Sequence, residues 1–429
     1  MSQDFEEQAR ELYRGMALAP MVRASSTPLR ALALHYGANV VYSEELMDRS
    51  IAATVREVND ALGTIDFIKD TSQLSKKTLK RLQRDNRPAL LLRIDPKLEA
   101  NKLIGQLGTG EPELALPAAR HIYQDVSAID INMGCPKKFS VSGGMGAALL
   151  SDPDRASRII KALRAEIPRP ISCKIRLLKD TASTVHFIEA MINAGAHAIA
   201  IHARRAGDDS TNPADWKTLE EVLGLMRPKY PNFPFLVNGD FYKRDEINDF
   251  LKKTGANGVL LARPALYNTS MFRPMTEALD DKTVVVQEYV QRAVKYDVHY
   301  KNTKYVIGEM MNNRRAPSER VPFLPQVYPS GQTIAKTCNC QSLEELCQVW
   351  NINLSNYNPY STPNMSTPLA PGEHRYEDSY FTKHQKGDEP TPIEPEAKRL
   401  RVEESEEKKF DPAVEKKVEA SVETTDTPK

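Results

Sequence analysis

The sequence predicts an α/β fold, a parallel (β/α)8 TIM barrel, from three observations. Short apolar runs rich in Ala, Val, Ile and Leu recur from the start of the chain to about Arg263. These runs do not alternate apolar and polar residues, which is typical of parallel strands buried on both faces. Stretches of helical periodicity separate the runs, and strand–helix units repeated in this way close into a barrel.

The expected strands are, in chain order, the eight runs MALAP, ANVVYS, LIGQL, AIDIN, ISCKI, AIAIH, PFLVNG and GVLLAR. Helix-start residues lie between them, such as Ser151 to Asp154 before RASRIIKALRAEI and Asp180 and Thr181 before STVHFIEAMINAG. The alternative is an open doubly wound sheet, which needs a G-x-G-x-x-G turn after the first strand. Residues 19–23, APMVR, stand there instead, so we expect the closed barrel.

Three domains are expected: a barrel over residues 14–275, a small all-α domain over 276–356 and a disordered charged tail over 357–429. The run TVVVQEYVQRAVKYDVHYKNTKYVIGEMM has amphipathic helical periodicity, and a further helix is expected near SLEELCQVWNI. The tail is composed largely of Pro, Ser, Thr, Glu and Lys, which predicts disorder. A long connection, residues 47–100, carries Lys76, Lys77, Lys80, Arg81 and Arg84 at helical spacing, either as a solvated helix face or as RNA contacts.

Composition indicates a soluble intracellular protein. The net charge is only +1, from 58 basic and 57 acidic residues, so any basic patch for a nucleic acid must be local. Five scattered cysteines favour a reducing compartment, and no segment approaches the roughly 20 apolar residues that span a bilayer. We therefore expect a cytoplasmic protein, with a nuclear pool as the lesser alternative because EAKRLR, residues 396–401, resembles a basic import signal.

No metal centre and no hydrolytic triad are expected. Cys338, Cys340 and Cys347 lack a C-x-x-C pair, the spacing typical of zinc ligands.

Polar groups follow nearly every run, where a barrel of this type assembles its active site. Lysine can hold the negative charge of a reduced flavin ring, and Gly239 with Arg263 can hold a phosphate. The residues that close the strands therefore form a set suited to binding flavin mononucleotide (FMN), although each residue alone has a structural explanation. Its members are Pro20, Met21, Glu45, Gln106, Asn132, Lys174, Arg176, His202, Asn238, Gly239, Asp240, Ala262 and Arg263.

Cys135 lies in NMGCPKKFSVSGGMGAALL, where a glycine and a proline fix a turn around it and three further glycines allow close approach of a ligand. A lone cysteine is more often a small buried hydrophobe than a catalytic group, and spacing alone leaves both readings open. Cys173 lies within an expected strand, and for it we expect the structural role.

These blocks together resemble the tRNA-dihydrouridine synthases, most closely their second eukaryotic cytoplasmic type. The most specific marks are LAPMVR, YSEELMD and DINMGCPKKFSVSGGMGAALLSDP, followed in the family's order by CKIR, IHAR, VNGD, LARPAL and VKYDVHYKNTKY. The resemblance covers about residues 14–275 and continues more weakly to 312. After Asn351 the sequence has no pattern of the double-stranded-RNA-binding domain that animal members commonly append.

The resemblance implies reduction of the C5–C6 double bond of a D-loop uridine in tRNA, typically at position 20, by FMN that NADPH or NADH recharges. It implies that Cys135 donates the proton to C5 as general acid, since a free thiol is protonated at neutral pH. The flavin shell it implies is Pro20, Met21, Glu45, Gln106, Lys174, His202, Asn238, Gly239, Asp240, Ala262 and Arg263. Candidate tRNA contacts are Asn132, Lys137, Lys138, Arg176 and Arg204.

The expected partner is tRNA, held in part by the helical domain, and the expected oligomeric state is a monomer. Two rival functions stay open on the sequence. One is an FMN-dependent reductase or dehydrogenase of a free pyrimidine, and the other is a non-catalytic RNA-binding protein that has kept the barrel. The presence of Cys135, Lys174, His202 and Arg263 argues against a non-catalytic protein, because a site that has lost its activity has no physical reason to keep all four.

Overall fold

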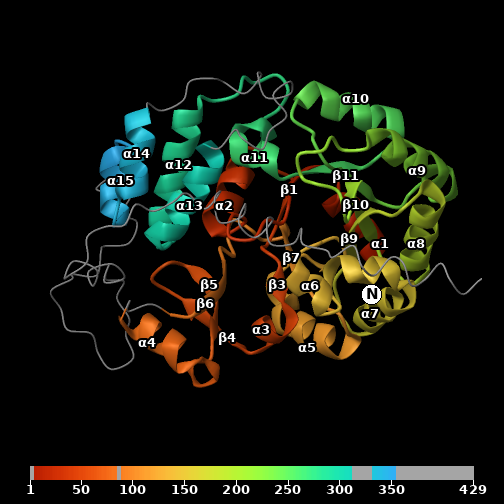
Figure 1. Ribbon diagram of the computed structural model, residues 1–429, viewed down its shortest axis with the longest axis horizontal. Helices are drawn as coiled ribbons and strands as arrows, with labels where there is room; N and C mark the ends of the chain where they lie inside the picture. The colour runs from red at the N-terminus through yellow and green to blue at the C-terminus, as the bar shows by residue number, and fades with distance from the viewer. Residues whose placement is uncertain (1–3, 85–87, 312–330, 354–429) are drawn as a thin grey trace, which may run out of the picture. The chain divides into compact units, whose positions relative to one another are not determined.

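The computed structural model describes residues 4–84, 88–311 and 331–353 (Figure 1). Eight parallel strands are paired in the order β2-β1-β12-β11-β10-β9-β8-β7, and β7 pairs back with β2, which closes the barrel. Each predicted run lies on one of these strands, so the predicted fold class is confirmed. The strands are β1 (Gly15–Leu18), β2 (Val40–Tyr42), β7 (Leu103–Gly108), β8 (Ala128–Asn132), β9 (Ile171–Leu177), β10 (Ala198–Arg205), β11 (Phe235–Asn238) and β12 (Gly258–Leu261).

Helices surround the barrel, whose interior is filled by side chains such as Val40, Ile104 and Leu236. Two predicted helix starts are confirmed, since Asp152 caps α7 and Asp180 caps α8 through their carboxylates. The helices are α1 (Phe5–Leu12), α2 (Thr27–His35), α3 (Asp48–Ala52), α5 (Pro112–Ile122), α6 (Lys138–Ser142), α7 (Pro153–Glu166), α8 (Thr181–Asn193), α9 (Trp216–Lys229), α10 (Arg244–Thr254) and α11 (Arg263–Tyr267).

The long connection after β2 holds a structure that the sequence pattern did not predict. Its strands β4 (Thr54–Asn59), β5 (Thr64–Lys69) and β6 (Leu90–Ile94) form a separate antiparallel sheet. The helix predicted over its lysines is present as α4 (Lys76–Arg84), and a short strand, β3 (Leu46–Met47), extends the pairing of β7.

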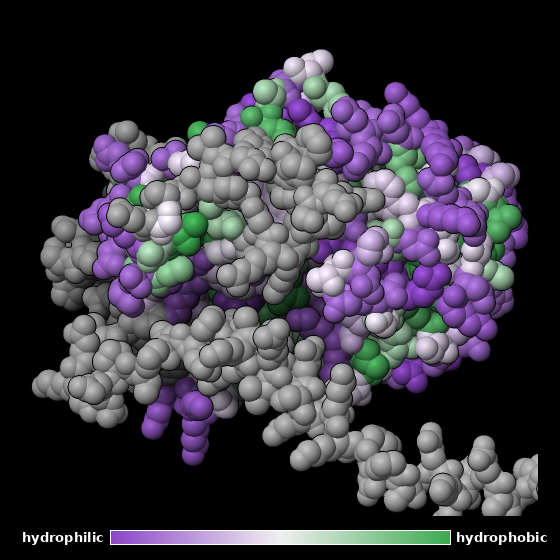
Figure 2. Space-filling model, turned by 45° about the horizontal axis from the view of Figure 1, so that its top comes forward, coloured by the Kyte–Doolittle hydropathy of each residue, from purple (hydrophilic) through white to green (hydrophobic). Residues whose placement is uncertain are grey.

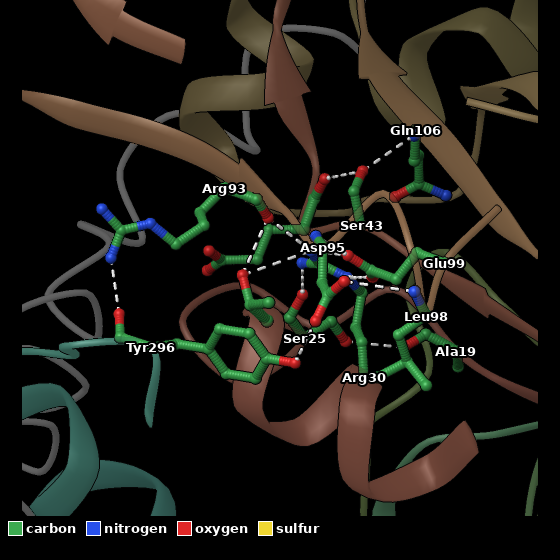
Figure 3. Close-up of polar contacts among 12 residues, drawn as sticks. Ala19, Ser25, Arg30, Ser43, Arg93, Asp95, Leu98, Glu99, Gln106 and Tyr296 are labelled. Atoms are coloured by element: carbon green, nitrogen blue, oxygen red, sulfur yellow. Dashed lines mark hydrogen bonds and ion pairs between the residues drawn. The ribbon is translucent and has the colours of Figure 1, made fainter. Parts of the chain in front are cut away.

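The predicted helices after the barrel are confirmed as α12 (Lys282–Lys295), α13 (Tyr300–Met311) and α15 (Leu343–Val349), and α14 (Gly331–Asn339) is an addition. Tyr296 joins this segment to β6, because its hydroxyl donates to Asp95 at 2.7 Å and its carbonyl accepts from Arg93 at 2.5 Å (Figure 3). No helix in the described ranges is long and apolar enough to cross a membrane. The predicted tail, the EAKRLR segment and residues 312–330 lie outside the described residues.

Candidate active site at the carboxyl ends of the barrel strands

A cavity of about 250 Å³ lies where the barrel strands end. Parallel strands place all their carboxyl ends on one face, which explains how residues far apart in sequence meet here. The cavity brings together most of the predicted site residues, and Val22, Gly134 and Pro136 join them. Its lining is Pro20, Val22, Glu45, Gln106, Asn132, Gly134, Cys135, Pro136, Lys174, Arg176, His202, Asn238 and Ala262.

The remaining predicted residues lie beside the lining or outside it. Met21, Gly239 and Arg263 directly follow lining residues in the chain. Asp240 is buried and accepts hydrogen bonds of 2.6 Å from both Arg204 and Arg263.

The three predicted tRNA contacts that do not line the cavity differ in exposure. Arg204 is only 2% exposed and also donates to the Asn212 carbonyl, so its guanidinium is held inside the protein. Lys137 and Lys138 are exposed next to the loop of Cys135.

Asp130 is fully buried and hydrogen-bonded to the cavity residue Gln106, and it was not among the site residues predicted from the sequence. The Gln106 side-chain amide donates to one oxygen of Asp130 at 2.8 Å, and Ser172 donates to the other at 2.7 Å. Burial raises the pKa of Asp130 to about 6, against these hydrogen bonds and the charge of Lys174. Gln106 itself lines the cavity. An acidic residue inside the apolar run AIDIN was the available signal.

Lys174 and His202 give the cavity wall its electrostatic character. Burial, reinforced by the charge of Arg176, lowers the pKa of Lys174 to about 8, while Asp130 and Cys135 oppose the shift. Burial, followed by the charge of Lys174 and neighbouring arginines, holds the pKa of His202 well below its usual value. At neutral pH the site therefore presents a charged ammonium beside a neutral imidazole.

Two buried polar atoms of the lining have no hydrogen-bond partner among the described residues, Nδ1 of His202 and Oε1 of Glu45. Burial also raises the pKa of Glu45, although a hydrogen bond from Asn132 opposes this. A buried polar atom without a partner costs free energy, on the order of 1–3 kcal/mol, which a polar ligand can recover. Together with the side chains of Lys174 and Gln106, these atoms fit a planar ligand rich in donors and acceptors, such as a flavin ring.

The backbone around Cys135 is fixed from both sides. The Asn132 side-chain oxygen accepts from the Gly134 and Cys135 amides at 2.9 and 3.2 Å, and Arg176 donates to the Gly134 carbonyl at 2.7 Å. Gly146 has a φ of +58°, and a Cβ there would lie 2.6 Å from the Cys135 carbonyl oxygen. Only glycine therefore fits at position 146. The close packing of this glycine against Cys135 helps to fix the loop whose free, half-buried thiol lies at the cavity.

A closed parallel barrel with a thiol, an ammonium and an imidazole at the carboxyl ends of its strands has the architecture of barrel enzymes, whose active sites lie at this face. No group of three or more His, Cys, Asp or Glu side chains able to hold a metal ion occurs within residues 4–84, 88–311 and 331–353. Unlike Cys135, Cys173 is fully buried within β9, as its predicted structural role requires.

The family model for dihydrouridine synthase (Dus) matches residues 17–319, and this protein belongs to that family, whose members are oxidoreductases. A fission yeast (Schizosaccharomyces pombe) protein named tRNA-dihydrouridine(20) synthase [NAD(P)+] is 41% identical over 303 residues, 69% of this chain and 59% of the relative. The budding yeast (Saccharomyces cerevisiae) protein of the same name is 32% identical over 363 residues, 80% of this chain and 91% of that relative. The chain thus spans less than two thirds of the first of these relatives.

Proposed function

We propose that this protein reduces the C5–C6 double bond of a D-loop uridine in cytoplasmic tRNA, expected at position 20, using FMN and either NADPH or NADH. The observation that carries the proposal is the convergence of Cys135, Lys174 and His202 on one cavity in a chain of the dihydrouridine synthase family. The names of the two yeast relatives support both the tRNA position and the nicotinamide reductant.

The cavity residues fit FMN, which when bound would supply the hydride for uracil C6. Lys174 would hold the negative charge of the reduced ring, and Gln106 would offer its amide oxygen. Asp240 would orient the Arg263 guanidinium, bonded to it at 2.6 Å, toward the phosphate. The complete proposed shell is Pro20, Met21, Glu45, Gln106, Lys174, His202, Asn238, Gly239, Asp240, Ala262 and Arg263.

Cys135 would donate its thiol proton to uracil C5 while C6 receives the hydride, and solvent would restore the thiol afterwards. One hydride and one proton saturate the double bond, so the uracil remains neutral. The hydrogen bonds that fix the Cys135 backbone would keep the sulfur on one side of the bound base. A positioned acid is worth typically 10²–10⁴-fold in rate.

The uridine must leave its stack to enter a cavity of this size, which favours a flexible loop as substrate. Asn132 and Arg176 line the cavity and would contact the base, whereas the exposed Lys137 and Lys138 would contact phosphates. Arg204 would act indirectly, through Asp240. The helical domain over residues 276–356 would hold more of the tRNA, with the protein acting as a monomer.

The test is to incubate purified protein with NADPH and tRNA lacking dihydrouridine, and to measure dihydrouridine by mass spectrometry. We expect Cys135→Ala to lose at least about 100-fold in rate. The matched control is Cys338→Ala, because Cys338 is an exposed free cysteine of α14 and should leave the rate unchanged.

Two outcomes would replace the proposal. A flavin-loaded protein that reduces free uridine or orotate and leaves tRNA unchanged would be a small-molecule pyrimidine reductase. A protein that binds tRNA without binding flavin would be an RNA-binding protein that has lost its chemistry.

A further inference from the structure

Three exposed apolar side chains belong to the cavity lining or to helix α6, which follows Cys135 in the chain. Val22 lines the cavity and is 59% exposed, and Phe139 and Val141 of α6 are 56% and 41% exposed. Single exposed apolar residues are normal on protein surfaces, and in Figure 2 the described surface is largely hydrophilic with scattered apolar residues. What distinguishes these three is that Val22 lines the cavity together with Cys135, and that Phe139 and Val141 belong to the short helix that follows Cys135 in the chain.

Helix α6 is fixed to the catalytic loop. It begins at Lys138, three residues after Cys135, so the Cα atoms of the two residues are at most about 11 Å apart. Ser140 is the buried residue of α6, and a Cβ on Gly146 would lie 2.5 Å from its hydroxyl and 3.0 Å from the Cys135 Cβ. Since successive helix residues are about 100° apart, burial of Ser140 leaves Phe139 and Val141 on its two outer flanks.

The surroundings of Phe139 favour RNA over a protein surface as its partner. Lys137 and Lys138 are exposed and precede it directly, so a cationic segment borders the aromatic ring. Aromatic rings next to lysines suit single-stranded RNA, because bases stack on the ring while the ammonium groups attract phosphates. A second protein chain that bound here would have to remove water from both lysine side chains, which costs free energy.

We propose that Phe139 stacks on a base next to the target uridine and so stabilises the tRNA loop with that uridine turned into the cavity. The inference rests on the proposed function and adds to it a residue that recognises the unstacked loop. A turned-out uridine leaves its neighbour without a stacking partner, and the exposed ring is placed to supply one. Val22 lies at the cavity as a further apolar contact for the entering base.

The experiment compares Phe139→Ala, Phe139→Leu and Phe139→Trp with the full-length wild type, measuring kcat and KM for tRNA, flavin content, and flavin reduction by NADPH without tRNA. We expect Ala and Leu to lower kcat/KM for tRNA by about tenfold to 100-fold, and Trp to stay within about threefold of wild type. Flavin content and flavin reduction should stay unchanged. The control is Leu225→Ala on α9, since Leu225 is 58% exposed.

Several results would overturn the inference. Full activity of Phe139→Leu would show that an apolar contact suffices and that no base stacks there. A loss of flavin content or flavin reduction in Phe139→Ala would show a structural role, and an equal effect of Leu225→Ala a general one. Failure of the wild type to modify tRNA would remove the proposed function itself, whereas an active wild type with a fully active Phe139→Ala removes only the stacking role.

Discussion

Lys174 is a buried cation whose charge depends on three neighbours. Burial and Arg176 favour the neutral amine, whereas Asp130 and Cys135 favour the charged one, and the balance gives a pKa of about 8. Because this pKa is lower in the folded than in the unfolded chain, the charged lysine opposes folding of the ligand-free protein below pH 8. That opposition fades as pH rises from 8 toward 10.5, the ordinary lysine value. A bound anion would reverse this balance.

The pH dependence of flavin reduction should therefore report on Lys174. We expect the rate of flavin reduction by NADPH to fall where Lys174 loses its charge, at a pH above the value of about 8 for the ligand-free protein, because bound flavin favours the charged lysine. In Lys174→Arg the fall should vanish, since a guanidinium stays charged, and in Lys174→Met the rate should be low throughout. Anaerobic stopped-flow measurements from pH 6 to 10 would show this. The same midpoint in wild type and Lys174→Arg would contradict the assignment.

Part of the site could be predicted at the level of single residues. Lys174 and His202 lie on apolar runs and Cys135 lies shortly after one, and strand ends of a parallel barrel converge whatever the details of packing. Asp130 and Arg204 were harder to interpret, because the sequence does not show which residues each side chain contacts. The structure directs Asp130 to Gln106 on the neighbouring strand and buries Arg204 against Asp240, which lies in the loop after β11.

At the level of elements, the barrel strands were predictable and the β4–β6 sheet was not. Barrel strands are apolar throughout because both faces are buried, so each run is distinct by itself. β4 has the sequence TVREVN, with Val55 and Val58 exposed, so its pattern does not match its burial. β6 pairs directly with β5 although α4 lies between them in the sequence, and local periodicity cannot reveal such a non-local contact.

Helix α2 is joined to the loops around it by a buried ion pair (Figure 3). The Arg30 guanidinium contacts the Glu99 carboxylate at 2.5 Å and donates to the carbonyls of Ser25 and Arg93. The Ser25 hydroxyl in turn donates to the Ala19 carbonyl and accepts from the Met21 amide. The pair therefore holds the loop that carries two proposed flavin residues, Pro20 and Met21.

Removing one member of this pair should be far more harmful than removing both. We expect Glu99→Leu to lower the free energy of unfolding by about 3–5 kcal/mol, because Arg30 is then buried without its partner. The double variant Arg30→Met with Glu99→Leu should recover much of that loss. The control is Glu166→Gln, since the Arg120–Glu166 pair is exposed and should contribute at most about 1 kcal/mol. Urea denaturation measures all three, and equal losses for the single and double variants would contradict the argument.

For the whole molecule, attraction of tRNA must come from local charge. With 58 basic and 57 acidic residues the protein has almost no net charge, so only local clusters of cations can attract a polyanion. One such cluster is on α4, where Lys76, Lys77 and Lys80 are exposed. It lies in the same connection as β6, to which the helical segment is joined through Tyr296.

If α4 contacts tRNA, its lysines should contribute to the salt dependence of binding. Each phosphate contact adds about 0.7–0.9 to the slope of log K against log salt, so replacing Lys76, Lys77 and Lys80 by Ala should lower that slope by about 2. Lys161, Lys217 and Lys252 serve as controls, because they are exposed on α7, α9 and α10 and their replacement changes the net charge equally. Fluorescence anisotropy with labelled tRNA at several salt concentrations would measure both slopes. Equal slopes for the two triple variants would mean that α4 is only a solvated helix face and that tRNA is held elsewhere.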